Sequence, residues 1–378
     1  MRQRLIDRIE YARDIRLEVL FEMKKSQKKI FVYGANRAAV VRIKLLREYG
    51  IYPEACVVDS EYYTDGMRCE ELEVYDLSKI CFDDSELFIG FEDIKKAREV
   101  VDNFSEKGIR VYHIEDPLRF RDMSFDFFVK NSERYQKAYD LLEDEESRDI
   151  FVTAINCRIS GESESLAKYK SNSQYDYDFG LMKLGDSEVY VDCGAYDGDT
   201  ILNFLEETKE RYAEIYAFEA DDQNAEKIEE KKIERLKVIR KVVGDKNGTV
   251  KFYNDGSMFS NVMESDIWGD GTRRDLYGDK NKFIEVPACR MDDELKGKKI
   301  TLIKMDIEGS ELVALKGAKE LIEANYPKMA ICVYHKPEDM FTLIEFVHEL
   351  EKHEKKYKYY LRHHSYDLSE TVLYALPV

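Results

Sequence analysis

The segment that most constrains the fold is an apolar strand followed by a glycine turn and a helix, SEVYVDCGAYDGDTILNFLEE, at residues 187–207. The strand ends at Asp192, and the chain then turns through Gly194 and Gly198 into a helix that begins near Thr200. Glycine lets a backbone approach a ligand closely and take torsion angles that other residues avoid. A strand, turn and helix of this kind is typical of nucleotide-binding α/β sheets.

A second strand follows this unit. The segment EIYAFEAD, at residues 214–221, ends at Glu219. A carboxylate at the end of the second strand can accept hydrogen bonds from both ribose hydroxyls of an adenosine. The turn alone does not fix the enzyme class, because a nucleotide-binding dehydrogenase could use a similar one.

Three further strands are predicted to end at the same edge of the sheet. They lie in residues 236–248, 298–322 and 327–339, and they end at Gly244-Asp245, at Asp306 and near His335. Ligands of open α/β sheets bind outside the carboxyl ends of the strands, so these side chains are candidates for a binding site. The chain closes with YKYYLRHHS and ETVLYALP, two alternating strands that predict a hairpin. A terminal hairpin beside a parallel sheet favours a methyltransferase over a dehydrogenase.

Residues 189–335 together resemble the FkbM family of methyltransferases. The similarity rests on a DxGAxxGxxT turn at residues 192–200, on the pair Phe218-Glu219, and on a K-D-EG-E-LKGA block, here Lys304, Asp306, Glu308, Gly309, Glu311 and Leu315-Lys316-Gly317-Ala318. The chain departs from the family at Ala220, where the family often has proline, but the carboxylate of Glu219 is retained. The resemblance implies an α/β fold with a Rossmann-like class I methyltransferase sheet and a terminal antiparallel hairpin.

The resemblance also implies S-adenosylmethionine as the methyl donor and a hydroxyl of a sugar or polyketide-like molecule as the acceptor, of which we prefer a saccharide. The residues expected to bind the donor are Asp192, Gly194, Ala195, Tyr196, Gly198, Thr200, Glu219, Ala220, Gly244, Asp245 and Asp306. An alcohol must lose its proton when it is methylated, so a general base within hydrogen-bond reach is expected. Asp306 and His335 are the candidates for this catalytic role.

Several of these side chains also have structural interpretations. Asp306 could cap the following helix, and Glu308 and Glu311 lie early in that helix, where negative charge favours the helix dipole. His335 could be a loop histidine with structural contacts only. Asp306 and Glu308 could share a divalent ion, but no third ligand is identifiable, so the sequence predicts no metal site. His363 and His364, in the terminal hairpin, are predicted to be structural.

The first part of the chain predicts a second, smaller Rossmann-like α/β domain. Residues 28–50 read as a strand that ends at Gly34 and a helix, and further strands are expected at residues 53–60, 85–91 and 109–116. Asp59 ends the second strand, where a ribose-binding acid would sit, but the glycine pattern is degenerate, so nucleotide binding and a structural role both stay open. We expect an accessory domain at residues 1–116, a helical linker at 117–185 and the methyltransferase domain at 186–378.

Composition limits the partners. The 378 residues carry 59 Lys and Arg against 77 Asp and Glu, a net charge of −18, which would repel phosphate backbones and anionic membranes. Nucleic acid and membrane insertion are therefore not expected, and we expect a soluble cytoplasmic protein with a small-molecule or saccharide acceptor. The seven cysteines show no CxxC spacing and are expected to be reduced. The sequence leaves open whether the chain forms a homo-oligomer.

Two other functions remain open on the sequence. A tandem Rossmann protein could bind a nicotinamide cofactor and carry out redox chemistry, although neither turn has a full GxGxxG pattern. A non-catalytic protein could keep the donor site as a sensor of S-adenosylmethionine. Donor binding without turnover on any acceptor would distinguish the sensor from the enzyme.

Overall fold

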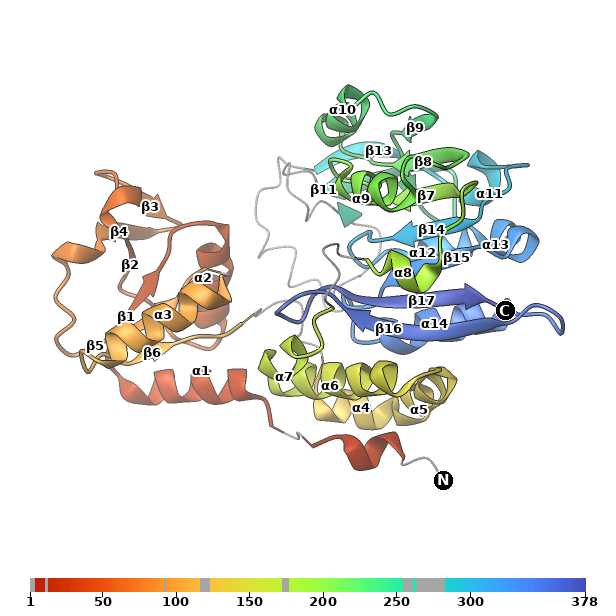
Figure 1. The fold of residues 1–378 in the computed structure, drawn as a ribbon. Helices are drawn as coiled ribbons and strands as arrows, with labels where there is room; N and C mark the ends of the chain where they lie inside the picture. Colours follow the sequence, from red (N-terminus) through yellow and green to blue (C-terminus); the bar gives the residue numbers. More distant parts are fainter. Residues whose placement is uncertain are drawn as a thin grey trace.

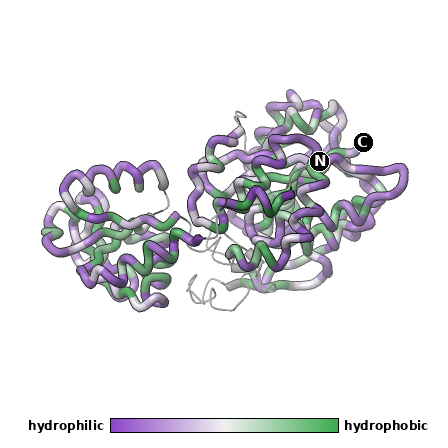
Figure 2. Tube along the Cα trace, turned by 90° about the horizontal axis from the view of Figure 1, so that it is seen from below, coloured by the Kyte–Doolittle hydropathy of each residue, from purple (hydrophilic) through white to green (hydrophobic). Residues whose placement is uncertain are grey.

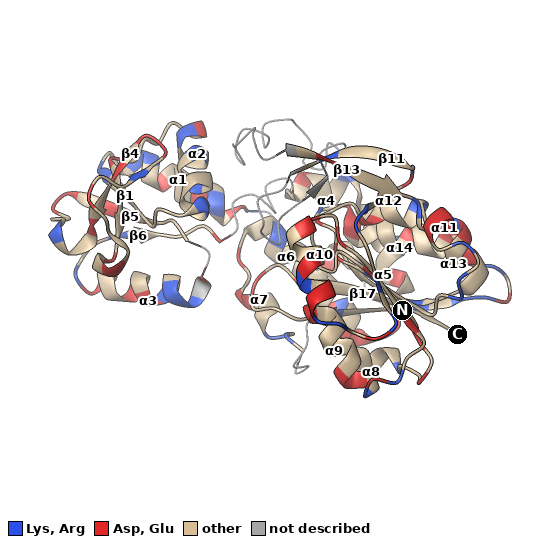
Figure 3. Ribbon diagram, turned by 90° about the horizontal axis from the view of Figure 1, so that it is seen from above, with Lys and Arg blue, Asp and Glu red and all other residues tan. Residues whose placement is uncertain are grey.

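The computed structural model describes residues 4–10, 13–91, 93–115, 123–171, 177–253, 261–262 and 283–378. The ribbon forms a smaller N-terminal lobe, coloured red to orange, and a larger lobe that holds most of the remaining chain (Figure 1). Apolar segments run through the interior of both lobes (Figure 2), and acidic and basic residues are interspersed over both (Figure 3). None of the helices in the described ranges is long and apolar enough to cross a membrane.

The N-terminal lobe is a small α/β unit, as the sequence predicts. Its sheet has the order β3-β4-β2-β1-β5-β6, and all neighbouring strands are parallel except β3 and β4. Its elements are α1 (Ile15–Ser26), β1 (Lys29–Tyr33), α2 (Arg37–Glu48), β2 (Ala55–Val58), η2 (Ser60–Tyr62), β3 (Arg68–Cys69), β4 (Leu72–Asp76), η3 (Leu77–Lys79), β5 (Ser85–Ile89), α3 (Ile94–Ser105) and β6 (Val111–Tyr112). The sequence missed β3 and β4, because their short runs have polar residues on one face.

The central strands of this lobe explain why it folds as a parallel sheet. β1 is apolar from Ile30 to Tyr33 and β5 from Leu87 to Ile89, and these side chains alternate between two separate buried clusters, one on each face of the sheet. Strands buried on both faces are typical of parallel sheets covered by helices. The expected Rossmann-like character of the domain is therefore confirmed.

The helices expected as a linker belong to the packing of the larger lobe. They are α4 (Phe125–Lys130), α5 (Ser132–Leu141), α6 (Glu145–Ser160), α7 (Glu164–Ala167) and α8 (Phe179–Met182), and the 3-10 turn η1 (Leu5–Arg8) lies on α5. Tyr135 of α5 packs on Phe341 with ring centroids 4.7 Å apart. Ser147 of α6 accepts a hydrogen bond from the backbone N–H of Leu361, 2.9 Å away. Helices α4 to α7 thus share one core cluster with the C-terminal sheet, and α8 packs into a second cluster of that sheet.

The C-terminal sheet has the order β16-β17-β15-β14-β7-β8-β9. Its strands are β7 (Val189–Cys193), β8 (Glu214–Phe218), β9 (Leu236–Ile239), β14 (Leu302–Met305), β15 (Lys328–Cys332), β16 (Tyr357–His363) and β17 (Thr371–Pro377). Its helices are α9 (Asp199–Thr208), α10 (Asp222–Glu230), α11 (Met291–Glu294), α12 (Glu311–Lys316), α13 (Lys319–Asn325) and α14 (Asp339–Glu349). β16 and β17 are antiparallel and the other five strands run parallel, which confirms the predicted class I sheet with its terminal hairpin.

The prediction of a single strand within residues 236–248 is wrong, because the structure has two strands there. The run divides into β9, which extends the large sheet, and β10 (Val242–Val243), which pairs with β13 (Phe283–Cys289) in a separate sheet. That sheet also holds β11 (Gly248–Tyr253) and β12 (Asn261–Val262). Arg240 and Lys241 separate the two strands, so the chain leaves one sheet and enters the other within a few residues.

The strand order places a switch point at β7. β8 pairs with one side of β7 and β14 pairs with the other side, so the connections leave β7 in opposite directions. Ligands of open α/β sheets bind at this point, outside the carboxyl ends of the strands. The ends of β7, β8 and β14 are Cys193, Phe218 and Met305.

Candidate active site

The glycine turn after β7 is held against the ends of both neighbouring strands. The backbone N–H groups of Gly194 and Ala195 donate to the carbonyl of Phe218, at 3.0 and 3.1 Å. A Cβ at Gly194 would lie 1.9 Å from the carbonyl oxygen of Asp306, and the residue has a φ of +79°. Only glycine meets both conditions. The turn predicted from sequence is therefore fixed directly against the strand that carries Asp306.

Other residues of this turn adopt unusual backbone conformations. Tyr196 has a φ of +47° and Gly198, which precedes the first residue of α9, has a φ of +86°. Ala195 and Thr200 are buried, and Tyr196 is partly exposed. Left-handed backbone at a non-glycine residue costs about 1 kcal/mol and is often found at functional sites.

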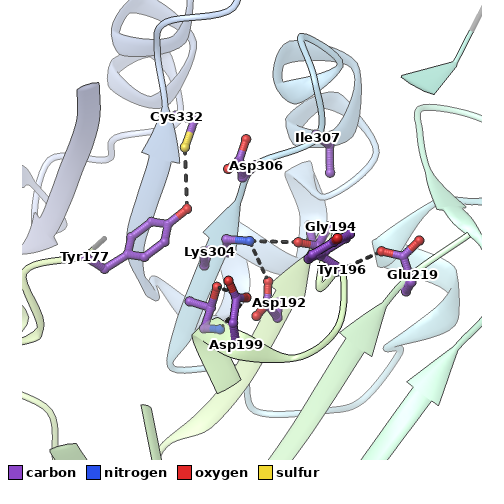
Figure 4. A network of polar contacts seen from close by, with 12 residues as sticks. Tyr177, Asp192, Gly194, Tyr196, Asp199, Glu219, Lys304, Asp306, Ile307 and Cys332 are labelled. Carbon is purple, nitrogen blue, oxygen red and sulfur yellow. Dashed lines mark hydrogen bonds and ion pairs between the residues drawn. The ribbon is translucent and has the colours of Figure 1, made fainter. Parts of the chain in front are cut away.

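Glu219 lies directly beside this turn. Its Oε2 accepts the backbone N–H of Tyr196 at 2.9 Å, and its Oε1 accepts that of Asp221 at 2.7 Å (Figure 4 shows the side chain next to Tyr196). Only 9% of the residue is exposed, and burial raises the pKa of its carboxyl to about 7. Each oxygen accepts a single hydrogen bond here, so each can still accept another. Ala220, the next residue, is partly exposed.

Asp192 is linked to the turn through a lysine. It is fully buried, with its Oδ1 3.0 Å from Nζ of Lys304 and its Oδ2 accepting the hydroxyl of Tyr190 at 2.9 Å. Nζ of Lys304 also donates to the carbonyl of Gly194 at 2.8 Å (Figure 4). Burial alone would lower the pKa of Lys304, but Asp192 and Asp306 raise it above its ordinary value. Asp192 therefore positions the turn through Lys304, and its contact with the donor stays a prediction.

Gly244 and Asp245 lie apart from these contacts. They follow β10 of the small sheet, and the N–H of Gly244 donates to Cys289 at 2.9 Å. A Cβ at Gly317 would lie 1.8 Å from the carbonyl oxygen of Gly244, which explains the glycine of the LKGA motif as a packing residue. A donor-binding role for Gly244 and Asp245 stays a prediction.

A second group of polar side chains surrounds His335. β15 ends at Cys332, so His335 lies in the loop beyond it, fully buried. Its Nε2 lies 3.4 Å from Asp306 and 3.7 Å from Glu308, and its Nδ1 lies 3.1 Å from Glu311. The two residues predicted to act as bases, Asp306 and His335, are thus brought together, and the side chain of Asp306 is 24% exposed.

The charges in this group are strongly coupled. Burial would lower the pKa of His335, but Glu311 and Glu308 raise it well above its ordinary value. Burial raises the pKa of Asp306. Burial would raise the pKa of Glu311, but His335 and the backbone N–H of Ile307 outweigh this effect and lower the pKa. His335 is therefore enclosed by carboxylates and not a solvated loop histidine.

The sequence did not assign roles to three residues at this site. Glu311 was interpreted through the helix dipole, yet it contacts the buried imidazole. Lys304 was matched to a motif without a role, and its ion pair with Asp192 became visible only in three dimensions. Tyr334, whose hydroxyl donates to Asp306 at 3.3 Å, lies at the end of the predicted fifth strand and could have been found by its position next to His335.

The site and the sheet order together define the class of fold as a Rossmann-like class I methyltransferase. Residues 192–361 match the family model of the methyltransferase FkbM domain. The crystal structure of methyltransferase FkbM from Methylobacillus flagellatus KT is similar with a TM-score of 0.72 and 21% identity, over 94% of this chain and 93% of that one. The chain therefore carries an FkbM methyltransferase domain.

Two further solved structures match less of the chain. A putative methyltransferase from Streptococcus mutans in complex with SAH has 12% identity and a TM-score of 0.33, covering 52% of this chain and 93% of its own. A putative rRNA-methylase from Clostridium thermocellum has 10% identity and a TM-score of 0.33, covering 53% and 92%. No curated protein matches the sequence.

Proposed function

We propose that this protein transfers a methyl group from S-adenosylmethionine to a hydroxyl oxygen of a saccharide or a related small molecule. The observation that carries the proposal is the position of Glu219 beside the glycine turn, at the switch point of a methyltransferase sheet and one strand away from β7. The donor would supply an activated methyl group. The residues of the chain would bind the donor, orient it and accept the proton of the acceptor hydroxyl.

The residues around Glu219 fit the adenosine part of the donor. The carboxylate is held by two backbone N–H groups and keeps acceptor capacity on both oxygens, as recognition of two ribose hydroxyls requires. Gly194, Ala195, Tyr196 and Gly198 would line the donor through the backbone of the turn. Asp192 and Lys304 would act through that turn by fixing its shape.

Asp306 is our candidate for the group that receives the acceptor proton. Its side chain is partly exposed and follows β14 at the same edge, whereas His335 is completely buried behind it. Methyl transfer to oxygen gains most from holding the two reacting atoms close and aligned. The carbon–sulfur bond breaks with its electron pair on sulfur, the carbon–oxygen bond forms, and the hydroxyl proton passes to the carboxylate of Asp306. His335 would be a positioning residue for Asp306.

Calorimetric titration of the purified protein tests the donor. S-adenosylmethionine and S-adenosylhomocysteine should bind saturably, and Glu219→Gln should weaken both. The matched control is Glu214→Gln, at the opposite end of β8, where the carboxylate pairs with Lys298 at 3.1 Å. Binding of NAD without either sulfur compound would overturn the proposal in favour of an oxidoreductase.

The acceptor requires a second measurement. Release of S-adenosylhomocysteine from S-adenosylmethionine should depend on an added saccharide that has free hydroxyls, and product analysis should place the new methyl group on oxygen. Asp306→Asn should lower turnover at an unchanged donor affinity. Donor binding with no turnover on a broad set of hydroxyl acceptors would instead support a non-catalytic donor-binding protein.

A further inference from the structure

Asp306, Glu308 and His335 offer a compact set of ligand atoms, and the methyl transfer proposed above uses Asp306 and His335 but gives no role to Glu308. One oxygen of each carboxylate and one imidazole nitrogen lie within 4.8 Å of one another. Two nitrogen–oxygen separations are 3.4 and 3.7 Å. Ligand atoms about 2.1 Å from one ion, at angles of 90–120°, are themselves separated by about 3.0–3.6 Å. The spacing thus suits a shared ion better than direct hydrogen bonds.

The imidazole gives an independent indication of a missing ligand. His335 is fully buried, and Nε2 has no hydrogen-bond partner within the described part of the chain. It faces Asp306 at 3.4 Å and Glu308 at 3.7 Å, and neither contact has the geometry of a well-formed hydrogen bond. A buried ring nitrogen that lacks a partner is costly unless a water or an ion completes it.

The other ring nitrogen has the environment of a metal-bound histidine. Nδ1 lies 3.1 Å from Oε1 of Glu311, which is itself fully buried and accepts the backbone N–H of Ile307 at 3.0 Å. Histidines that bind metals usually direct their second nitrogen at a carboxylate or carbonyl, which fixes the tautomer and the ring orientation. When an ion binds, Nε2 would release its proton and direct its lone pair at the ion, while Glu311 keeps Nδ1 protonated.

The charge of the group suits a cation. Three carboxylates, those of Asp306, Glu308 and Glu311, lie around the imidazole of His335. A divalent ion between Asp306 and Glu308 would be attracted by all three charges.

We propose that Asp306, Glu308 and His335 bind a divalent cation, with Mn²⁺ as the best match. Two carboxylates favour a hard ion, and one imidazole favours a borderline one, so Mn²⁺ satisfies both preferences. Glu308 has a φ of +54° and precedes Gly309 at +91°, and this turn brings its carboxylate back towards β15. The sequence offered only two ligands, because His335 is distant in the chain and adjacent only after folding.

A second group of possible ligands, Asp306, Cys332 and Glu370, shares one residue with this set. Cys332 is fully buried, and its Sγ already lies 3.5 Å from the hydroxyl of Tyr177. Metal ligation by cysteine requires the thiolate, and the complete burial of this thiol disfavours the charged form. We therefore assign the ion to the set that contains His335.

This inference deepens the proposed function, on which its role in catalysis rests. A divalent cation beside Asp306 would bind the acceptor hydroxyl, acidify it and orient it. An acceptor with two adjacent hydroxyls, which many saccharides have, could contact the ion through both oxygens. Cation binding itself does not depend on methyl transfer and can be measured without the donor.

The test is a titration of the full chain with Mn²⁺ after treatment with a chelator, followed by electron paramagnetic resonance and calorimetry in the absence of donor. We expect one saturable site. Glu308→Gln should weaken binding by at least tenfold, the size of effect expected when one charged ligand is lost. Glu370→Gln is the matched control and should bind Mn²⁺ as the unchanged protein does. Glu308 lies in a turn, and circular dichroism checks that its variant folds.

Three results would overturn the inference: no saturable Mn²⁺ site, binding that Glu308→Gln leaves unchanged, and binding that Glu370→Gln abolishes. The affinity for S-adenosylhomocysteine, measured on the same samples, separates the two proposals. A protein that binds Mn²⁺ but no donor retains the cation site and refutes the proposed function. A protein that binds donor but no Mn²⁺ supports the proposed function and refutes the cation site.

Discussion

Glu219 shows how one residue can couple ligand binding to pH. Burial raises the pKa of its carboxyl to about 7, although the hydrogen bonds from the backbone N–H groups of Asp221 and Tyr196 lower it. The free protein thus holds much of this group protonated below pH 7, whereas ribose hydroxyls require the ionised acceptor. Binding must then release a proton, so affinity for S-adenosylhomocysteine should fall up to about tenfold for each pH unit below 7 and be constant above.

Calorimetry between pH 5.5 and 8.5 measures this dependence. Glu219→Gln removes the titrating group and should give weaker binding that hardly changes with pH. If the unchanged protein binds equally well across this range, Glu219 does not accept the ribose hydroxyls as an ionised group.

Gly194 tests the contact between the turn and β14. Alanine would place its Cβ 1.9 Å from the carbonyl oxygen of Asp306 at a φ of +79°, and backbone cannot move aside as a flexible side chain can. We expect Gly194→Ala to lower the free energy of unfolding by about 3 kcal/mol or more. Urea denaturation measures the change. Gly185→Ala is the control, because its Cβ would make only an ordinary 3.6 Å contact with Glu188, and an equal loss there would contradict the argument.

Residue roles were predictable where backbone geometry determines the residue type. Gly194, Gly198 and Glu219 lie at the sheet edge where the sequence predicted them. The burial of Asp192 against Lys304 was not predicted, because a strand-terminal carboxylate looks the same in sequence whether it faces solvent or a buried lysine. The partner of Asp192, Lys304, comes from a strand more than a hundred residues later, and pairing at that distance leaves no local signal.

At the scale of elements, the terminal hairpin contains two buried histidines. His363 Nδ1 lies 3.0 Å from the hydroxyl of Thr371, and His364 Nε2 lies 2.9 Å from that of Tyr374, in keeping with the structural role expected for both. Burial lowers the pKa of His363 to about 4 and that of His364 to about 3. Both values lie below about 6.5, the ordinary histidine pKa expected in the unfolded chain. The stability that these groups contribute is therefore present above pH 6.5 and is lost as the pH falls towards 4.

Denaturation at a series of pH values should show this loss. Each histidine takes up about one proton on unfolding in that window, worth about 1.4 kcal/mol per pH unit. His364→Gln should therefore reduce the slope of stability against pH by about one proton, even if it lowers stability at pH 7. An unchanged slope would mean that His364 is not buried in its neutral form.

Elements were predictable when their pattern was long and consistent. The five parallel strands and the hairpin were found from apolar runs, whereas residues 236–248 were read as one strand although β9 and β10 lie in different sheets. The apolar pattern continues through both strands, so it does not reveal the change of partner. Strand pairing is a tertiary property and overrides local preference.

At the scale of the whole molecule, the sequence predicted least well which part of the protein the helices at residues 123–182 pack against. Their composition suggested a bridge, since an amphipathic helix shows that one face is buried but not against what. In the structure, Phe151 and Tyr135 share one core with Phe341 and Leu361. The expected boundary at residue 116 lies outside the described residues, and the boundary at 186 stays a prediction.

Two truncated chains would locate the boundary of the catalytic unit. A chain of residues 186–378 would expose Phe341, Tyr359 and Leu361, which are at most 1% exposed in the whole protein, at a cost of about 1.5–3 kcal/mol for each side chain. It would also lose the ion pair between Arg362 and Asp144, 2.7 Å apart. Because a domain has only about 5–15 kcal/mol of net stability, we expect this chain to aggregate or to lack a cooperative transition.

A chain of residues 123–378 retains these contacts and should fold and bind S-adenosylhomocysteine without the N-terminal lobe. It loses the packing of η1, where Leu5 is 1% exposed and Arg8 pairs with Asp149 at 2.6 Å, and a few polar contacts such as that of Glu115 with the N–H of Ser163, so its Tm should fall by a few degrees. Thermal unfolding with and without S-adenosylhomocysteine compares the two chains. If residues 186–378 alone unfold cooperatively and bind as tightly, the helices are a linker after all. If neither chain folds, the N-terminal lobe supports the catalytic one, and its role is more than that of an accessory.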